Sequence, residues 1–174
     1  EKVFVAANAL AAGGCGFNVV RYGNVAGSRG SVLPLFKRLK AEGKPLKVTD
    51  ERMTRFWITM GQSVDLVLEA LKMADEGHHS KILVPKIPSI RIADLATAVR
   101  GDDAGLVELN TGIRPGEKLH ETLITEDESL CTTRWHNTFC IHQHLTSGVV
   151  DEGWRYTSDG NDDWLSVEQL KEMI

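Results

Sequence analysis

The segment Arg21–Ser31 carries residue types that can bind an anion. It reads Arg-Tyr-Gly-Asn-Val-Ala-Gly-Ser-Arg-Gly-Ser and stands between an apolar run at residues 17–20 and a helical pattern. Glycines let a backbone approach a ligand closely, Asn and Ser offer hydrogen bonds, and Arg supplies a fixed positive charge. Asn24 could donate to a phosphate or sugar oxygen, or it could cap the turn, and the residues alone do not separate these two roles.

A second segment places polar residues beside a charged residue in an apolar run. Thr49 and Asp50 follow a short predicted strand, and Arg55 stands within the apolar stretch 53–58. A buried guanidinium needs an anionic partner. That partner is either a bound anion or a carboxylate of this chain, with Asp50 or Glu51 the nearest in sequence.

A third segment, at residues 111–118, predicts a phosphate contact at the start of a helix. Pro115 suits the first helical position, and we expect a helix from there to about Ile124. Arg114 would then stand at the helix N-terminus, where the macrodipole favours anions over cations. A phosphate between the guanidinium and the free amides would resolve that conflict. Glu117 could accept a hydrogen bond from a sugar hydroxyl, or it could only complement the dipole.

Two other chemistries have weaker support in the sequence. Potential zinc ligands gather in one short span, at Cys131, His136, Cys140, His142 and His144. Their spacing matches no common pattern of paired zinc ligands, and residues 140, 142 and 144 would share one face of a strand. A Cys–His nucleophile in the same span has no evident orienting third group. The tryptophans at 135, 154 and 164 are expected to serve packing.

The elements that must position these segments alternate between strand and helix, which predicts an α/β fold. Helices are expected at 1–12, 31–42, 60–76, about 89–100 and 166–174. Strands are expected at 17–22, 44–50, 81–85, 106–109 and 139–142. A capping box of Ser166 with Gln169 starts the last helix. No internal repeat or low-complexity stretch interrupts this order.

Composition narrows the class of protein. The 174 residues have a net charge of −4 and 42% hydrophobic residues, so nothing indicates a nucleic-acid partner. No apolar run approaches the ~20 residues of a membrane span. Three cysteines without close pairing favour a reducing, cytoplasmic setting. The chain begins at Glu1 in what reads as the middle of a helix, so we expect it to be a fragment of a longer protein.

The three candidate segments together resemble the inverting UDP-N-acetylglucosamine 4,6-dehydratases, in the polysaccharide-biosynthesis branch of the extended short-chain dehydrogenase/reductases. The likeness extends to about Ser129 and returns from Tyr156 to Leu170. The motifs that carry it are residues 21–32, Val48-Thr49-Asp50, residues 53–59, Val84-Pro85-Lys86-x-Pro88-Ser89 and residues 112–121.

This resemblance implies the C-terminal part of a Rossmann-type fold, with its last parallel strands and a small substrate-binding domain. Residues 1–129 would hold the remaining Rossmann strands interleaved with the substrate-binding subdomain, and residues 130–174 a C-terminal extension ending in a helix. The family's glycine-rich turn, its Thr-Asp-Lys group and its Tyr-x-x-x-Lys pair would lie upstream. This chain would therefore hold no catalytic residue, and alone it would be inactive.

For the complete enzyme, the resemblance implies an NADP-dependent lyase of nucleotide-sugar metabolism. NADP would take a hydride from sugar C4, water would leave across C5 and C6, and the hydride would return to C6. The product would be a 4-keto-6-deoxy sugar nucleotide. The enzyme would be cytoplasmic and a homo-oligomer, with no nucleic-acid partner, no membrane span and no metal.

The implied substrate contacts are Asn24 and Arg114 at the diphosphate, Thr49 and Arg55 near uridine and phosphate, and Glu117 at a ribose hydroxyl. The implied cofactor contacts, at the nicotinamide end, are Tyr22, Val25, Ala26, Gly27, Ser28 and Arg29. Two alternatives stay open: a UDP-sugar 4-epimerase of the same superfamily, and a non-catalytic remnant that binds sugar nucleotides.

Overall fold

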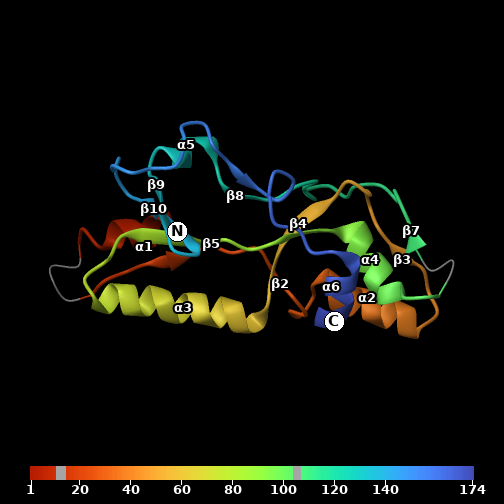
Figure 1. Cartoon of the computed structure of the whole chain (residues 1–174). Coiled ribbons are helices and arrows are strands. Elements are labelled where there is room, and N and C mark those ends of the chain that lie inside the picture. The colour runs from red at the N-terminus through yellow and green to blue at the C-terminus, as the bar shows by residue number, and fades with distance from the viewer. Residues whose placement is uncertain (11–14, 104–106) are drawn as a thin grey trace. The chain divides into compact units, whose positions relative to one another are not determined.

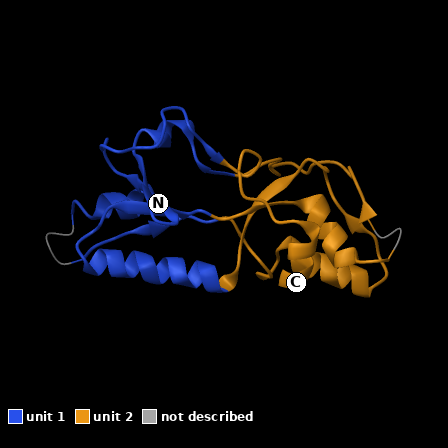
Figure 2. Cartoon of the chain, in the orientation of Figure 1, with its two compact units in different colours: residues 1–22, 61–86, 122–156 blue, residues 23–60, 87–121, 157–174 orange. Residues whose placement is uncertain are grey.

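The computed structural model describes residues 1–10, 15–103 and 107–174, and it has the expected α/β composition. The chain forms two compact units, each assembled from three separate stretches (Figure 2). Unit 1 contains residues 1–22, 61–86 and 122–156, and unit 2 contains residues 23–60, 87–121 and 157–174. The expected division at residue 129 stays a prediction.

Unit 1 is built on a four-stranded sheet in the order β1-β5-β10-β9 (Figure 1). Strand β1 pairs in parallel with β5, while β10 runs antiparallel to both β5 and β9. Helix α3 buries Leu66, Ala70 and Met73 in a cluster with Leu83 of β5 and Cys140 of β10. The bounds are α1 Lys2–Ala7, β1 Val19–Val20, α3 Met60–Asp75, β5 Lys81–Pro85, β8 Thr122–Ile124, α5 Glu126–Ser129, β9 Thr132–Trp135 and β10 Thr138–His142.

Unit 2 contains a three-stranded sheet in the order β2-β4-β6 and a parallel pair, β3-β7. Strand β2 is parallel to β4, and β6 is antiparallel to it. The core includes Phe36 of α2, Trp57 of β4, Leu95 of α4 and Leu170 of α6. The bounds are β2 Asn24–Val25, α2 Val32–Ala41, β3 Leu46–Lys47, β4 Thr54–Ile58, β6 Ser89–Arg91, α4 Ile92–Arg100, β7 Val107–Glu108, β11 Tyr156–Thr157 and α6 Val167–Met173.

Gly23 lets β2 lie close against β4. A Cβ atom at this position would lie 2.4 Å from the Phe56 Cβ and 2.9 Å from the Phe56 carbonyl oxygen. Any other residue here would have to separate the two strands. The glycine before Asn24 is therefore required by packing.

Several helices and strands lie where the sequence predicts them. The helices expected at 31–42, 60–76 and about 89–100 are present as α2, α3 and α4, and the predicted strand at 81–85 is β5. In α3, however, the apolar repeat at Val64, Val67, Leu68 and Leu71 does not mark the buried face, because these side chains are exposed while Leu66, Ala70 and Met73 are buried. The capping box of Ser166 and Gln169 is present at the start of α6, and a second box joins Thr125 and Glu128 at α5. None of the described helices combines the length and the apolar character needed to cross a membrane.

The predicted helix from Pro115 to Ile124 is wrong. Glu117 N–H donates to the Arg114 carbonyl at 3.0 Å and Gly116 has φ of 82°, which fits a type II turn with Pro at its second position. Residues 122–124 then form β8. The opening helix is shorter than expected, since α1 ends at Ala7. Residues 11 and 12 of the expected helix lie outside the described residues.

Candidate functional site

All five predicted substrate contacts, Asn24, Thr49, Arg55, Arg114 and Glu117, belong to unit 2. The predicted cofactor residues Val25–Arg29 belong to unit 2 as well, whereas Tyr22 is the last residue of the first stretch of unit 1.

The loop at residues 25–31 joins β2 to α2 and is held by backbone hydrogen bonds. Ala26 N–H donates to the Ile58 carbonyl at 2.8 Å, which continues the β2–β4 ladder by one residue. Ser28 N–H then donates to Val25 at 3.2 Å and Ser31 N–H to Ser28 at 3.0 Å, so two tight turns follow. The φ angles of Gly27 and Gly30, 72° and 82°, favour glycine at both turns.

The start of α2 holds a polar group that the sequence did not single out. Ser31 is the N-cap of this ten-residue helix, but its side chain makes no capping hydrogen bond. Its Oγ is buried without a partner among the described residues, and so is Nε1 of Trp57. The first turn of α2 carries no acidic residue. A ligand anion at this helix start could therefore accept from Ser31 and from free backbone amides.

Asn24 is exposed on β2, opposite Trp57 in the parallel register of β2 and β4. Its side chain makes no hydrogen bond with a described residue, so the capping role considered from the sequence is not seen there. The amide is free to bind a ligand.

Arg55, on β4, is largely buried, with 12% of its side chain exposed. Nη1 donates to the carbonyls of Thr54 at 2.6 Å and Leu119 at 3.1 Å, and Nη2 donates to that of Lys118 at 2.7 Å. Nε lies 3.6 Å from a carboxylate oxygen of Glu121. Burial lowers the pKa of Arg55, and the negative charges of Glu121 and Glu117 oppose that effect in part.

Asp50, one of the two acids considered as a partner for Arg55, pairs with Arg52 instead. Asp50 accepts from the Nε and Nη2 atoms of Arg52 at 3.0 and 2.7 Å. These hydrogen bonds, with that of the Arg52 backbone, lower the pKa of Asp50 to about 2.

The Thr49 hydroxyl is half-buried and lies 3.7 Å from the sulfur of Met53. Its carbonyl accepts from Gly112 N–H at 3.1 Å, which brings Thr49 next to the third candidate segment.

Arg114 and Glu117 lie together in an exposed turn. Glu117 closes it from both sides, because its N–H donates to the Arg114 carbonyl and its Oε2 accepts from the Arg114 N–H at 3.1 Å. Arg114 does not stand at a helix N-terminus, so the dipole argument for an anion does not hold. Its exposed guanidinium makes no ion pair with any described residue and remains available to an anion.

Arg21, the first residue of the opening segment, belongs to unit 1 and has two carboxylate partners. Its guanidinium donates to both oxygens of Glu1 at 2.9 and 2.6 Å and to both oxygens of Glu128 at 2.9 Å. It also donates to the Leu123 carbonyl at 2.7 Å. Burial lowers the pKa of Arg21, but the two carboxylates raise it more, so the net shift is upward.

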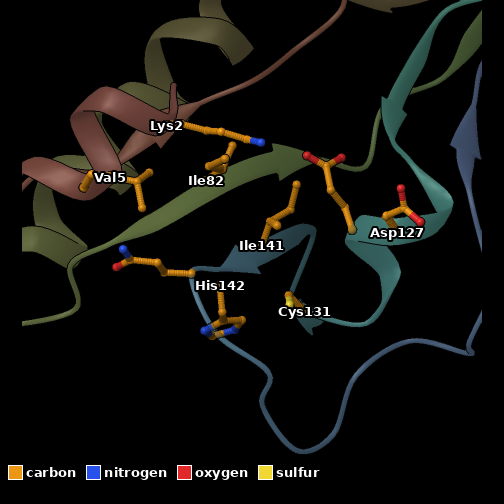
Figure 3. Close-up of a pocket in the computed structure, with 10 residues that line it drawn as sticks. Lys2, Val5, Ile82, Asp127, Cys131, Ile141 and His142 are labelled. Atoms are coloured by element: carbon orange, nitrogen blue, oxygen red, sulfur yellow. The ribbon is translucent and has the colours of Figure 1, made fainter.

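Two residues of the Cys- and His-rich span, Cys131 and His142, help to line a pocket of about 400 Å³ in unit 1. In Figure 3, Ile82 and Ile141 lie between Lys2 of α1 and the side chains of His142 and Cys131. His142 Nε2 lies 2.9 Å from the Thr133 hydroxyl, and burial lowers the pKa of His142. The pocket contains none of the predicted substrate or cofactor residues.

Among the described residues, the same span forms no group of metal ligands. Across residues 1–10, 15–103 and 107–174, no three His, Cys, Asp or Glu side chains are placed to hold a metal ion. Burial raises the pKa of the Cys140 thiol, which disfavours the reactive thiolate. Phe139 of the span packs against two aromatic residues further along the chain: Trp154 stacks on Tyr156 at 5.9 Å between ring centroids, and both contact Phe139.

Comparison with known proteins identifies the family. The profile of the polysaccharide biosynthesis protein family matches residues 1–143, and the chain belongs to this family. It is 41% identical to a UDP-N-acetylglucosamine 4,6-dehydratase (inverting) of Campylobacter jejuni over 100% of this chain and 56% of the relative. The chain thus spans about half the length of the curated relatives it matches.

Two further similarities bear on fold and function. An X-ray structure of Pen from Bacillus thuringiensis superposes with a TM-score of 0.84 and 32% identity, covering 99% of this chain and 53% of that one. A UDP-glucose 4-epimerase of Rickettsia massiliae is 43% identical, but over 63% of this chain and 32% of the relative. The likeness to the dehydratase extends further along this chain than the likeness to the epimerase.

Proposed function

We propose that unit 2 binds a UDP-linked N-acetylhexosamine, as the substrate half of an NADP-dependent dehydratase that forms a 4-keto-6-deoxy sugar nucleotide. The observation that carries the proposal is the combination in unit 2 of a free, exposed Arg114 guanidinium with a likeness to an inverting dehydratase over the whole chain. This activity would supply precursors for polysaccharide or other glycan synthesis.

In this proposal each substrate contact has a distinct task. Arg114 binds the diphosphate through charge-assisted hydrogen bonds. Asn24 donates its free amide to the same group, and Thr49 and Arg55 border the uridine and phosphate. Glu117 accepts from a ribose hydroxyl with the carboxylate oxygen that its turn leaves free, since Oε2 already accepts from the backbone.

NADP would accept the hydride from sugar C4 and return it to C6. The loop at 25–31 suits a phosphate-bearing cofactor, because the buried Ser31 hydroxyl has no partner among the described residues and the start of α2 carries no acid. The proposed contacts are Tyr22, Val25, Ala26, Gly27, Ser28 and Arg29. Catalytic residues, a cytoplasmic location and the homo-oligomeric state belong to the complete enzyme in the same proposal.

Calorimetric titration of the 174-residue chain tests the proposal. UDP-N-acetylglucosamine is expected to bind saturably and more tightly than UDP-glucose, and the chain alone is expected to form no 4-keto product. Absence of binding at millimolar ligand would contradict the proposed function, and 4-keto product formed by the pure chain would refute its expected inactivity.

The second candidate is a UDP-sugar 4-epimerase, which the likeness to the Rickettsia massiliae protein supports. Tighter binding of UDP-glucose than of UDP-N-acetylglucosamine in the same titration would favour it. A non-catalytic remnant would bind either sugar nucleotide, and the complete enzyme would then lack turnover.

A further inference from the structure

The stretch after the Arg114 turn is anchored on the first residues of β4. Thr54 N–H donates to the Leu119 carbonyl at 3.0 Å, and Arg55 donates to the carbonyls of Lys118 and Leu119. Before the turn, Thr111 N–H and Gly112 N–H donate to the carbonyls at residues 48 and 49, each at 3.1 Å. The backbone of the turn is thus held at both ends, and these two sets of hydrogen bonds position the Cα atom from which the Arg114 side chain extends.

A buried chain of hydroxyl groups completes the second anchor. The Thr54 hydroxyl lies 2.8 Å from Nδ1 of His120 and 2.7 Å from the hydroxyl of Ser158. The Ser158 oxygen accepts from the Glu121 N–H at 2.9 Å. Ser158 is fully buried and Thr54 is 4% exposed. Three segments of unit 2, centred on residues 54, 120 and 158, meet in this network.

The protons carried by these groups decide which of them donates in each hydrogen bond of the network. Of the two described partners of the Ser158 hydroxyl, the Glu121 N–H can only donate, so the Ser158 proton goes to the Thr54 oxygen. The Thr54 proton then needs an acceptor, and Nδ1 of His120 is the group placed to accept it. If that acceptor is removed, a donor stays buried and unsatisfied, which is more destabilising than the loss of an exposed hydrogen bond.

We propose that His120 is a positioning residue for sugar-nucleotide binding: its Nδ1 accepts from Thr54 and so holds the turn that carries Arg114 and Glu117. The inference rests on the proposed function. No contact between His120 and the ligand is involved. The effect on affinity passes through the position of the turn.

Two substitutions at one position separate this role from general stability. His120→Leu removes the acceptor, and the affinity for UDP-N-acetylglucosamine is expected to fall about three- to tenfold, as for one hydrogen bond. In His120→Asn the Oδ1 atom can take the place of Nδ1, and the affinity is expected to stay within about twofold of wild type. If the Leu variant does not fold, His120→Gln serves instead, because its amide reaches past the Nδ1 position.

Asn161 supplies a matched control within unit 2. Its amide donates to the Ile87 carbonyl at 2.9 Å and to the Ser89 hydroxyl at 3.0 Å, far in sequence from the turn. Asn161→Ala is expected to lower the thermal midpoint as His120→Leu does, but to leave the affinity unchanged. Equal affinities of the Leu and Asn variants at position 120 would overturn the proposal, and so would an equal loss in Asn161→Ala.

Hydrogen exchange of the ligand-free chain tests the positioning independently of ligand binding. Backbone amides of residues 110–121 are expected to exchange faster in His120→Leu than in wild type and at the wild-type rate in His120→Asn. Unchanged exchange in the Leu variant would overturn the inference even if the sugar nucleotide binds. If wild type does not bind the sugar nucleotide, the proposed function fails and the exchange rates still decide whether His120 holds the turn.

Discussion

Arg21 of unit 1 and Arg55 of unit 2 are both largely buried, but their partners differ. Arg21 faces the carboxylates of Glu1 and Glu128, and these more than balance its charge. Arg55 faces three backbone carbonyls, and its one carboxylate lies at 3.6 Å. The pKa is raised overall for Arg21, whereas burial lowers it for Arg55.

The difference indicates which unit keeps positive charge for a ligand. Carbonyl partners satisfy the N–H groups of a guanidinium without neutralising it, so Arg55 contributes positive potential to unit 2. Arg114 in the same unit has no carboxylate partner among the described residues. In unit 1, Arg21 is already neutralised and serves as a structural tie. An anionic substrate is therefore expected to depend on the arginines of unit 2.

The largest effect on stability is expected from Arg55→Met. The change removes three charge-assisted donors from carbonyls that lie in or near the protein interior, and the free energy of unfolding is expected to fall by about 2–3 kcal/mol. Urea denaturation measures it. Arg134→Met, at an exposed position on β9, is the control and is expected to stay within about 0.5 kcal/mol of wild type. Equal losses in both variants would contradict the role given to Arg55.

Arg114→Ala is expected to weaken binding of the UDP-sugar by about 1.5–3 kcal/mol, the range for hydrogen bonds to charged groups. Stability is expected to change by less than about 0.5 kcal/mol, because the side chain is exposed. Calorimetry and urea denaturation give the two quantities. Unchanged affinity would remove Arg114 from the site and leave Arg55 as the main source of positive charge.

A matched pair of acid-to-amide substitutions tests the carboxylates themselves. Glu128→Gln is expected to lower the free energy of unfolding by about 1–2 kcal/mol, since Glu128 binds Arg21 with both oxygens, while Gln can still close the capping box of α5. Glu121→Gln is expected to lower it by about 0.5 kcal/mol or less, because its contact with Arg55 is long. The reverse order would show that Arg55 relies on its carboxylate and not on carbonyls.

The smallest expected effect is on the acid dependence of stability. Burial raises the pKa of Glu128, but hydrogen bonds from Arg21 and Thr125 lower it further, and the net shift is downward. Its contribution is full above the unfolded pKa of about 4.3 and is lost as pH falls through the lower folded value. Glu128→Gln should therefore flatten the fall in stability below about pH 4.5.

Arg55→Met should leave that slope nearly unchanged, because its carbonyl partners do not titrate. Urea midpoints between pH 6 and pH 3 would compare the two variants, and an equal flattening in both would contradict the distinction. The pKa of Asp50 is about 2, so unit 2 is expected to lose a further part of its stability at lower pH. This loss is expected in every variant that keeps Asp50.

Local sequence predicted the elements whose signals are local. The helical periodicity of α2 and α4 and the cap of α6 need only neighbours a few residues apart. In α3 the periodicity predicted the helix but not its buried face, since Val64, Val67, Leu68 and Leu71 are exposed. The helix expected at 115–124 failed because Pro-Gly suits both a helix start and a type II turn. Long-range contacts decided between them, since β4 binds the carbonyls of Lys118 and Leu119 across more than 60 residues of sequence.

The residue types of the candidate site could be predicted from the sequence, but the groups that these residues contact could not. Asn24, Thr49, Arg55, Arg114 and Glu117 all lie in unit 2, and their roles toward a substrate stay predictions. Sequence alone could not show that carbonyls surround Arg55, nor that Thr54 meets His120 and Ser158, because these pairs are 66 and 104 residues apart. The Ser31 hydroxyl, which has no partner among the described residues, had one local signal: a serine at an N-cap position, before a first helical turn that contains no acidic residue.

The division into units has a consequence for the order of folding during synthesis. The chain passes between the units after residues 22, 60, 86, 121 and 156, so each unit needs stretches that are made at different times. Leu170 of α6 is fully buried in the core of unit 2. That core cannot close before α6 has been synthesised, and contacts between such distant stretches slow folding. Residues 23–60 therefore complete their packing only when a helix more than 100 residues further along the chain becomes available.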